Sequence, residues 1–458
     1  MTLAVRPSSG PGSSSGRRPG VRRWAWRSVL MLLLAGGPLA AAAQTCGAAG
    51  GDNRPADKSD CEAAGPANHP SAEPASATAN SIDLVTGNKY LHETDHAWPD
   101  GLVLTRHYNS RNPYVRSLGS AWTHGFETTL VRVHRGRMRS RSSAVVELQV
   151  IQADGRRLVF RAVREPGGDR RVLRFRAVDP AYGSVTERPD AAPDRRYLWR
   201  WRSGRQLSFD EEGRLTAVES PYGLSLSLAY QPVSGLLERV SARSGLALRF
   251  EYFGESDRVR GVPGAWPGRL AAVLQPDGTR VRYRYDETGL LAEVLHPSGE
   301  NSRFIYDDPV TPHAVTRWTD GEGRPRGDYR YDQQGRAVYS ARAGGVEAVW
   351  VAYRLPARAG DPGETRVVDS AGRASLFVWS YLMRTHQAMI VSASGDGCTA
   401  CPPVGVERRY DRDGRLMEES FGNGVLHIVR LHDAAGRLAE LRAVQGASAR
   451  SRIGVRPE

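Results

Sequence analysis

A short phrase returns along the chain and constrains its fold more than any other feature. Each copy has an Asp and a Gly three residues apart, usually after an aromatic residue and before Arg or Leu. The copies are Asp210 with Gly213, Asp286 with Gly289, Asp332 with Gly335, Asp411 with Gly414, Asp433 with Gly436, and a degenerate copy, Asp369 with Gly372. Most steps between them lie near multiples of about 21 residues, which is typical of architectures that stack one small unit many times.

The phrase has the chemistry of a tight turn between two strands. An Asp at the first position of a type I turn accepts hydrogen bonds from the turn amides, and a Gly at the fourth position tolerates positive φ. Between two such turns, residues 280–285 alternate Arg with Val or Tyr, which is the period of a β-strand. A single hairpin is only marginally stable in water, so many must lie side by side. The sequence therefore predicts an all-β fold: tandem hairpins in a long, curved antiparallel sheet over residues 151–441, with little helix.

Tyrosines at the strand ends are expected to line the inner face of this sheet and to pair across strands. They are Tyr230, Tyr252, Tyr283, Tyr285, Tyr306, Tyr331, Tyr353 and Tyr410, and the outward face carries Arg280, Arg282 and Arg284. An exposed apolar face drives association. We therefore expect the isolated chain to self-associate or to need a partner polypeptide. Tyrosines exposed in a groove would instead favour carbohydrate binding or adhesion at a cell surface, which is the alternative function.

The first residues have the pattern of a secretory signal. Arg22 and Arg23 precede an apolar run from Val29 to Ala35, and small residues up to Ala43 resemble a cleavage site. Such a run is too short for a stable membrane span. We expect residues 1–43 to be a signal peptide and the chain to be exported, as a periplasmic, cell-surface or secreted protein. Residues 44–79 are rich in Ala, Gly and Pro and have no periodicity, so they are expected to be a flexible linker.

The formal charge of +13 at first suggests nucleic-acid binding. Six of the arginines lie in the expected signal peptide, and the remaining basic residues are spread along strands beside Asp and Glu. Because phosphate binding needs clustered basic residues, we expect no nucleic-acid partner.

One motif suggests zinc. His92, Glu93 and His96 match H-E-x-x-H, in which a helix brings two His ligands and a catalytic Glu together. Gly87 upstream and Pro99 downstream leave too little room for that helix. A zinc metalloprotease is therefore the weaker alternative, and we expect no metal, no cofactor and no catalytic residue.

The cysteines are Cys46, Cys61, Cys398 and Cys401. Disulfides are favoured in an exported protein, so we expect Cys46 to pair with Cys61 and Cys398 with Cys401. A zinc site built from the four thiolates, and free or mixed pairing, remain as alternatives.

A second block of sequence precedes the repeats. It runs from Asn80 through Thr86-Gly87-Asn88-Lys89, Thr105-Arg106-His107-Tyr108-Asn109 and Leu118-Gly119 to Trp122. Together the two blocks resemble the bacterial Rhs/YD-repeat family, whose animal relatives are the teneurins, with the domain of unknown function that often precedes Rhs repeats. The resemblance implies a continuous β-sheet that coils into a shell around a C-terminal toxin or other cargo.

The resemblance also implies an order of domains and a function. Residues 80–150 would form the Rhs-associated β module, 151–441 the repeat sheet and 442–458 a disordered tail. The implied function is that of an exported, non-enzymatic scaffold, part of a β-shell that shelters or presents a toxin or other partner polypeptide. The self-cleaving segment and the toxin of large family members are not expected in this chain.

Overall fold

The computed structural model describes residues 81–445 except 113, 135–144, 164–171, 179–181, 202–203, 359, 383–386, 398–403, 413, 423 and 434–437. The chain divides into two units, Met1–Gln44 and Thr45–Glu458, and every described residue belongs to the second. The expected signal peptide and linker, the four cysteines and Gly436 lie outside the described residues.

One long sheet contains most of the described chain. Each strand from β6 to β31 pairs antiparallel with the strand that follows it in the sequence. The strands in the first part are β6 (Thr129–His134), β7 (Val145–Ile151), β8 (Arg157–Val163), β9 (Arg174–Ala177), β10 (Ser184–Glu187), β11 (Tyr197–Arg200), β12 (Gln206–Phe209), β13 (Leu215–Glu219), β14 (Ser225–Tyr230), β15 (Leu237–Ala242) and β16 (Ala247–Tyr252). The later strands are β17 (Leu270–Leu274), β18 (Arg280–Tyr285), β19 (Leu291–Leu295), β20 (Ser302–Ile305), β21 (Arg317–Asp320), β22 (Pro325–Tyr331), β23 (Ala337–Arg342), β24 (Val349–Arg354), β25 (Gly363–Asp369), β26 (Ala374–Leu382), β27 (Gln387–Gly395), β28 (Val406–Tyr410), β29 (Leu416–Phe421), β30 (Leu426–His432) and β31 (Leu438–Gln445).

Helix is scarce in the described residues, and the predicted all-β fold is confirmed. The α-helix there is α3 (Glu255–Val259), and the 3-10 turns are η1 (Pro99–Gly101), η3 (Pro193–Arg195) and η4 (Ala343–Gly345). Within the part of the chain that the structure describes, no helix has the length and apolar character needed to cross a membrane.

The Asp and Gly of the repeat phrase close the hairpins. Between β12 and β13, the Gly213 amide donates to the Asp210 carbonyl at 3.1 Å, and the Arg214 amide donates to Asp210 Oδ1 at 2.8 Å. Gly213 has a φ of +81°, which is why a residue without Cβ stands there. The pairing shifts register between Ser208 and Phe209, so the strand bulges where the hairpin closes.

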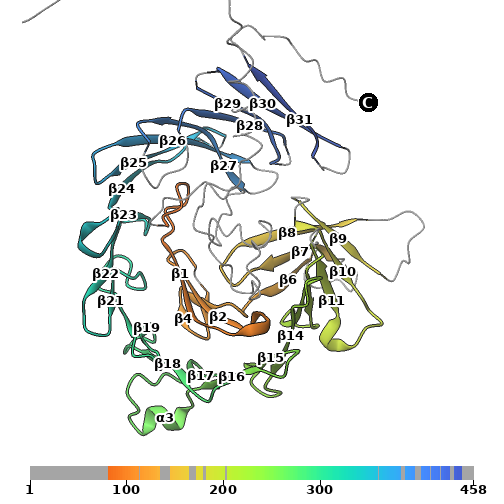
Figure 1. Ribbon diagram of the computed structural model, residues 1–458, viewed down its shortest axis with the longest axis vertical. Coiled ribbons are helices and arrows are strands. Elements are labelled where there is room, and N and C mark those ends of the chain that lie inside the picture. Colours follow the sequence, from red (N-terminus) through yellow and green to blue (C-terminus); the bar gives the residue numbers. More distant parts are fainter. Residues whose placement is uncertain are drawn as a thin grey trace, which may run out of the picture. The chain divides into compact units, whose positions relative to one another are not determined.

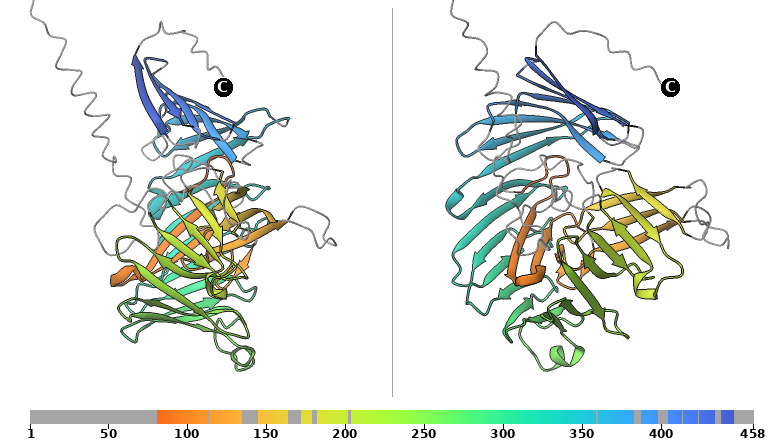
Figure 2. Two further views of the ribbon diagram at one scale, coloured as in Figure 1. Left: turned by 90° about the vertical axis from the view of Figure 1, so that its right-hand side faces the viewer. Right: turned by 45° about the vertical axis from the view of Figure 1, so that its right-hand side comes forward.

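A smaller sheet lies inside the curve of the long one (Figures 1 and 2). It contains β1 (Tyr90–Ala97), β2 (Val103–Asn109) and β5 (Trp122–His124), and a two-stranded ladder of β3 (Val115–Arg116) and β4 (Gly119–Ser120) accompanies it. We call residues 81–128 the N-terminal module. Strands β6 and β7 pair in the long sheet, whose first strand begins at Thr129. The domain boundary at residue 150 stays a prediction.

The module covers the inner face of the sheet. Leu104, Tyr108 and Trp122 of the module share one buried cluster with Tyr283 and Phe304 of the sheet. Tyr283 is 1% exposed. In this part of the sheet, the chain's own N-terminal module therefore buries the aromatic face.

Coverage decreases towards the last strands. A second cluster packs Ile82 and Leu84 of the module against Val351 and Phe377. In contrast, β30 is half-buried along its length and β31 is exposed along its length. Strand β31 continues to Gln445, and the domain boundary at residue 441 stays a prediction.

Candidate functional site: the junction of module and sheet

A buried polar cluster joins the module to the sheet. Arg106 Nε lies 2.8 Å from Asp95 Oδ1, and the Tyr283 hydroxyl donates to Asp95 Oδ2 at 2.8 Å. His296 Nε2 lies 3.5 Å from Asp95 Oδ1. The carboxylate of Asp95 thus contacts one group from the module and two from the sheet, which ties together elements far apart in the sequence.

A bulge in β1 places Asp95 in this cluster. The β1–β2 pairing shifts between Thr94 and His96, leaving Asp95 as the extra residue. On the other side of the ion pair, the Arg106 guanidinium lies 5.4 Å from the Trp122 ring centroid and 5.8 Å from that of Phe304. Aromatic faces attract a guanidinium, so these rings help to offset the loss of water around it.

The H-E-x-x-H residues lie on strand β1 and not on a helix. His92 Nδ1 lies 3.2 Å from His107 Nδ1, whereas His96 stacks on Trp98 with ring centroids 3.8 Å apart. The two histidines therefore have different neighbours. In the part of the chain that the structure describes, no group of three or more His, Cys, Asp or Glu side chains is arranged to hold a metal ion.

Glu93, between these histidines, has an unusual environment. Burial raises the pKa of Glu93 to about 7, and the charge of Arg106 partly offsets that rise. A carboxyl group with a pKa near neutrality can act as a general acid or base. Burial is the largest cause of the raised pKa of Glu93.

The tyrosines of the repeats bond the strand ends to one another. The Tyr230 hydroxyl donates to the Leu215 carbonyl at 2.6 Å, and the Tyr252 hydroxyl donates to the Leu237 carbonyl at 2.9 Å. The same bond to a carbonyl 15, 16 or 20 residues earlier recurs at Tyr285, Tyr306, Tyr331, Tyr353 and Tyr410. These rings are buried or half-buried, so they do not form the exposed platform that carbohydrate stacking would need.

The Arg of the phrase completes the repeating unit. In four of the predicted turns its Nε donates to the carboxylate of the phrase Asp, as in the 2.7 Å contact from Arg214 to Asp210. The Arg214 guanidinium also lies 4.8 Å from the Tyr230 ring centroid, and Arg336 lies 4.8 Å from that of Tyr353. The Asp286 turn, in which Leu290 replaces Arg, keeps the amide bond to Asp286 at 2.9 Å.

Sequence reasoning missed one copy of this unit. Asp320 and Gly323 form the same turn, and Arg324 Nε donates to Asp320 Oδ2 at 2.7 Å. The Asp-x-x-Gly-Arg pattern is present in the sequence. The preceding residue is Thr319 instead of an aromatic residue, which is why the copy was not recognised.

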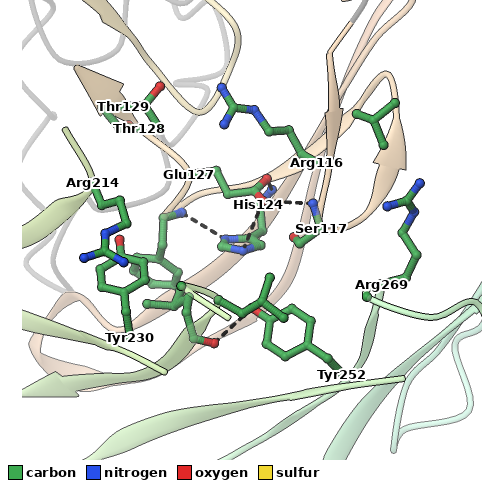
Figure 3. Close-up of a pocket in the computed structure, with 16 residues that line it drawn as sticks. Arg116, Ser117, His124, Glu127, Thr128, Thr129, Arg214, Tyr230, Tyr252 and Arg269 are labelled. Carbon is green, nitrogen blue, oxygen red and sulfur yellow. Dashed lines mark hydrogen bonds and ion pairs between the residues drawn. The ribbon is translucent and has the colours of Figure 1, made fainter. Parts of the chain in front are cut away.

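A cavity of about 340 Å³ opens beside the junction. Figure 3 shows Arg116, Arg214, Arg269, Tyr230 and Tyr252 around it, with the contacts of Glu127 and His124 at its centre. Glu127 Oε1 accepts the Ser117 amide and Oε2 accepts the His124 amide, both at 3.1 Å. The cavity therefore combines residues of the module, of the turn before β13, of strands β14 to β16 and of the segment just before β17.

Comparisons with known proteins agree with both blocks of sequence. A domain of unknown function, DUF6531, matches residues 79–160, and the RHS repeat matches residues 268–301. No curated protein matches the chain. The resemblance to the Rhs/YD-repeat family, with the domain that precedes its repeats, is confirmed.

Two of the solved structures that the chain matches, both with TM-scores below 0.5, are named as follows. The crystal structure of TcdB2-TccC3 without its hypervariable C-terminal region is 10% identical with a TM-score of 0.29, and the match covers 74% of this chain and 20% of that one. A Tc holotoxin pore of Photorhabdus luminescens is 9% identical with a TM-score of 0.27, and the match covers 80% of this chain and 22% of that one. The chain thus spans about a fifth of the length of the solved chains that it matches.

Proposed function

We propose that this protein is an exported, non-enzymatic Rhs-type scaffold that forms part of a β-shell and shelters or presents a toxin or other partner polypeptide. One observation carries the proposal. The run of antiparallel pairings from β6 to β31 makes a single curved sheet whose inner face is apolar. A surface of this kind can enclose a polypeptide, and its repeat turns are occupied by their own hydrogen bonds and not by catalytic geometry.

The last strands are the part of the sheet that a partner polypeptide would cover. Leu438 and Leu441 of β31 are each 55% exposed, and Val425 before β30 is 58% exposed. Neighbouring exposed apolar side chains mark surfaces for protein contact. The N-terminal module already occupies the earlier strands, so the free apolar surface lies at the C-terminal end.

A protection experiment tests the scaffold function. An unstructured reporter polypeptide would be fused after Glu458, and its rate of proteolysis compared with that of the same reporter fused to an unrelated folded domain. We expect markedly slower cleavage in the fusion to this chain, because a sheltering sheet limits access of the protease. Equal rates in the two fusions would refute the sheltering role.

A second experiment tests export. We propose cleavage of the signal peptide after Ala43, so the chain expressed from Met1 in a bacterial host should be recovered outside the cytoplasm with Gln44 as its first residue. The masses of the oxidised and reduced chain would also test the disulfides proposed for Cys46 with Cys61 and Cys398 with Cys401. Retention of the full-length chain in the cytoplasm would contradict export.

A further inference from the structure

The wall of the cavity at the junction carries three guanidinium groups and one carboxylate, that of Glu127. Of its three guanidinium groups, that of Arg214 is paired with Asp210 at 2.7 Å. Arg116 and Arg269 make no ion pair and no side-chain hydrogen bond with any residue that the structure describes. Arg269 Nε is moreover shielded from solvent without a hydrogen-bond partner.

A shielded donor without an acceptor is costly. Removing a charged donor from water without a hydrogen bond costs the full free energy of its lost hydration. In agreement, burial lowers the pKa of Arg269, while the nearby Tyr285 acts in the opposite direction. An anion placed against Arg269 would supply the missing acceptor, and Arg116 would share its charge.

Glu127 does not supply that acceptor, because among the described residues it makes no ion pair or hydrogen bond with Arg116 or Arg269. Its oxygens accept the amides of Ser117 and His124, so the carboxylate fixes the loop between β5 and β6. His124 Nδ1 accepts the Phe126 amide at 3.3 Å, which places the proton of the neutral ring on Nε2. That nitrogen lies 3.7 Å from Glu127 Oε1. Glu127 and His124 therefore form an internal support of the cavity wall.

The rest of the wall favours an organic anion. Phe126, Leu237 and Tyr252 give the cavity apolar surface, and a volume of about 340 Å³ suits a small molecule or one or two side chains. A planar guanidinium matches a carboxylate in a two-bond geometry. A strongly hydrated inorganic anion would gain nothing from the apolar wall.

We propose that this cavity binds an organic carboxylate, held by Arg116 and Arg269 with its carbon skeleton against Phe126, Leu237 and Tyr252. The site is distinct from the exposed C-terminal strands and does not depend on the scaffold function. The carboxylate could be a free small molecule or an acidic residue of a polypeptide, since both present the same group to the two guanidiniums.

Calorimetric titration of the complete mature chain tests the site. Benzoate should bind with a Kd of about 1 mM or tighter, and the neutral isostere benzamide should not bind. Arg116→Gln and Arg269→Gln should each weaken benzoate binding about tenfold or more, because each removes a charge-assisted hydrogen bond. Arg243→Gln, at an exposed arginine outside the cavity, is the matched control and should leave binding unchanged.

Further titrations distinguish the two sources of the carboxylate. A short peptide with Glu between apolar residues, compared with its Gln counterpart, tests a polypeptide source. Tighter binding of the Glu peptide than of benzoate would assign the carboxylate to a polypeptide, and the reverse would assign it to a small molecule. Equal binding of benzoate and benzamide, equal binding of inorganic phosphate, or no binding of any carboxylate would overturn the proposal. Arg269→Lys keeps the charge but not the two-bond geometry, so it should retain part of the benzoate binding. This variant replaces Arg269→Gln in the titration if Arg269→Gln fails to fold.

Discussion

At the scale of single residues, the glycines of the turns meet two different physical demands. Gly213 (φ +81°) and Gly299 (φ +86°) both have positive φ. A Cβ at Gly213 would lie 1.9 Å from the Leu130 carbonyl oxygen, whereas a Cβ at Gly299 would meet nothing within 4 Å. In addition, the Leu130 amide donates to the Gly213 carbonyl at 2.8 Å, so the β12–β13 turn lies against the first strand of the sheet.

These two sites separate backbone strain from steric exclusion. We expect Gly299→Ala to reduce the free energy of unfolding by about 1 kcal/mol, the cost of positive φ alone. Gly213→Ala should cost about 2–4 kcal/mol, because overpacking against β6 adds to the same strain. Urea denaturation of the two variants would measure the difference. Equal losses in the free energy of unfolding would show that the close contact between β6 and this turn does not contribute to stability.

The raised pKa of Glu93 gives a pH dependence with a definite sign. Between its ordinary value of 4.5 and its folded value of about 7, the folded chain holds a proton that the unfolded chain has released. The contribution of Glu93 is therefore fully present below pH 4.5 and is lost as the pH rises through about 7. Glu93→Gln should raise the free energy of unfolding by about 2 kcal/mol at about pH 8 and leave it nearly unchanged at about pH 4.

Denaturation of the Glu93→Gln variant at both pH values checks this, with the exposed Glu238→Gln as control. The same variant addresses the zinc hypothesis. A proteolytic activity of the unmodified chain that is lost with Glu93→Gln and with a chelator would contradict the non-enzymatic proposal.

At the scale of elements, Asp and Gly close the hairpins of the repeat phrase at their tips, and seven tyrosine hydroxyls bond to carbonyls of earlier strands or of the residues before them. Tyr252→Phe removes only the hydroxyl and leaves the Leu237 carbonyl without this donor. We expect a loss of about 1 kcal/mol in the free energy of unfolding. Tyr114→Phe is the matched control, because the Tyr114 hydroxyl makes no hydrogen bond with the described residues and the side chain is 44% exposed. A loss no larger than that of the control would show that these hydroxyl bonds contribute little.

The hairpins could be predicted because their chemistry is local. The residues that determine a turn or a strand lie within a few positions of one another, as in the turn of Asp210 and Gly213 and in the alternating residues of β18. The tyrosine bonds could not be predicted, because a period-two pattern places Tyr252 on a face but does not say which carbonyl its hydroxyl reaches. The contact of Asp95 with Tyr283, 188 residues apart, depends on how the module lies inside the sheet, and no spacing in the sequence encodes that.

At the scale of the whole molecule, the sheet and the module depend on each other. The sheet leaves an apolar inner face that water would penalise, and the module brings its own apolar residues and one buried ion pair to cover it. Within the part of the chain that the structure describes, Tyr283 is fully buried, whereas β31 is exposed along its length. Around Tyr283, the chain therefore buries its own apolar face. At β31, apolar side chains stay exposed and can contact another polypeptide.

The Asp95 cluster tests this mutual dependence. Asp95→Ala leaves the Arg106 guanidinium buried without its carboxylate, which should cost about 3–5 kcal/mol and loosen the module from the sheet. Sedimentation velocity should then show more self-association than that of the unmodified chain, because the apolar inner face becomes accessible. The double variant Asp95→Leu with Arg106→Met replaces the pair by apolar side chains of similar size, which is often neutral for buried pairs. It should therefore match the unmodified chain in stability and in sedimentation coefficient. An Asp95→Ala variant that is as stable as the unmodified chain and no more associated than it would show that apolar contacts alone hold the module in place.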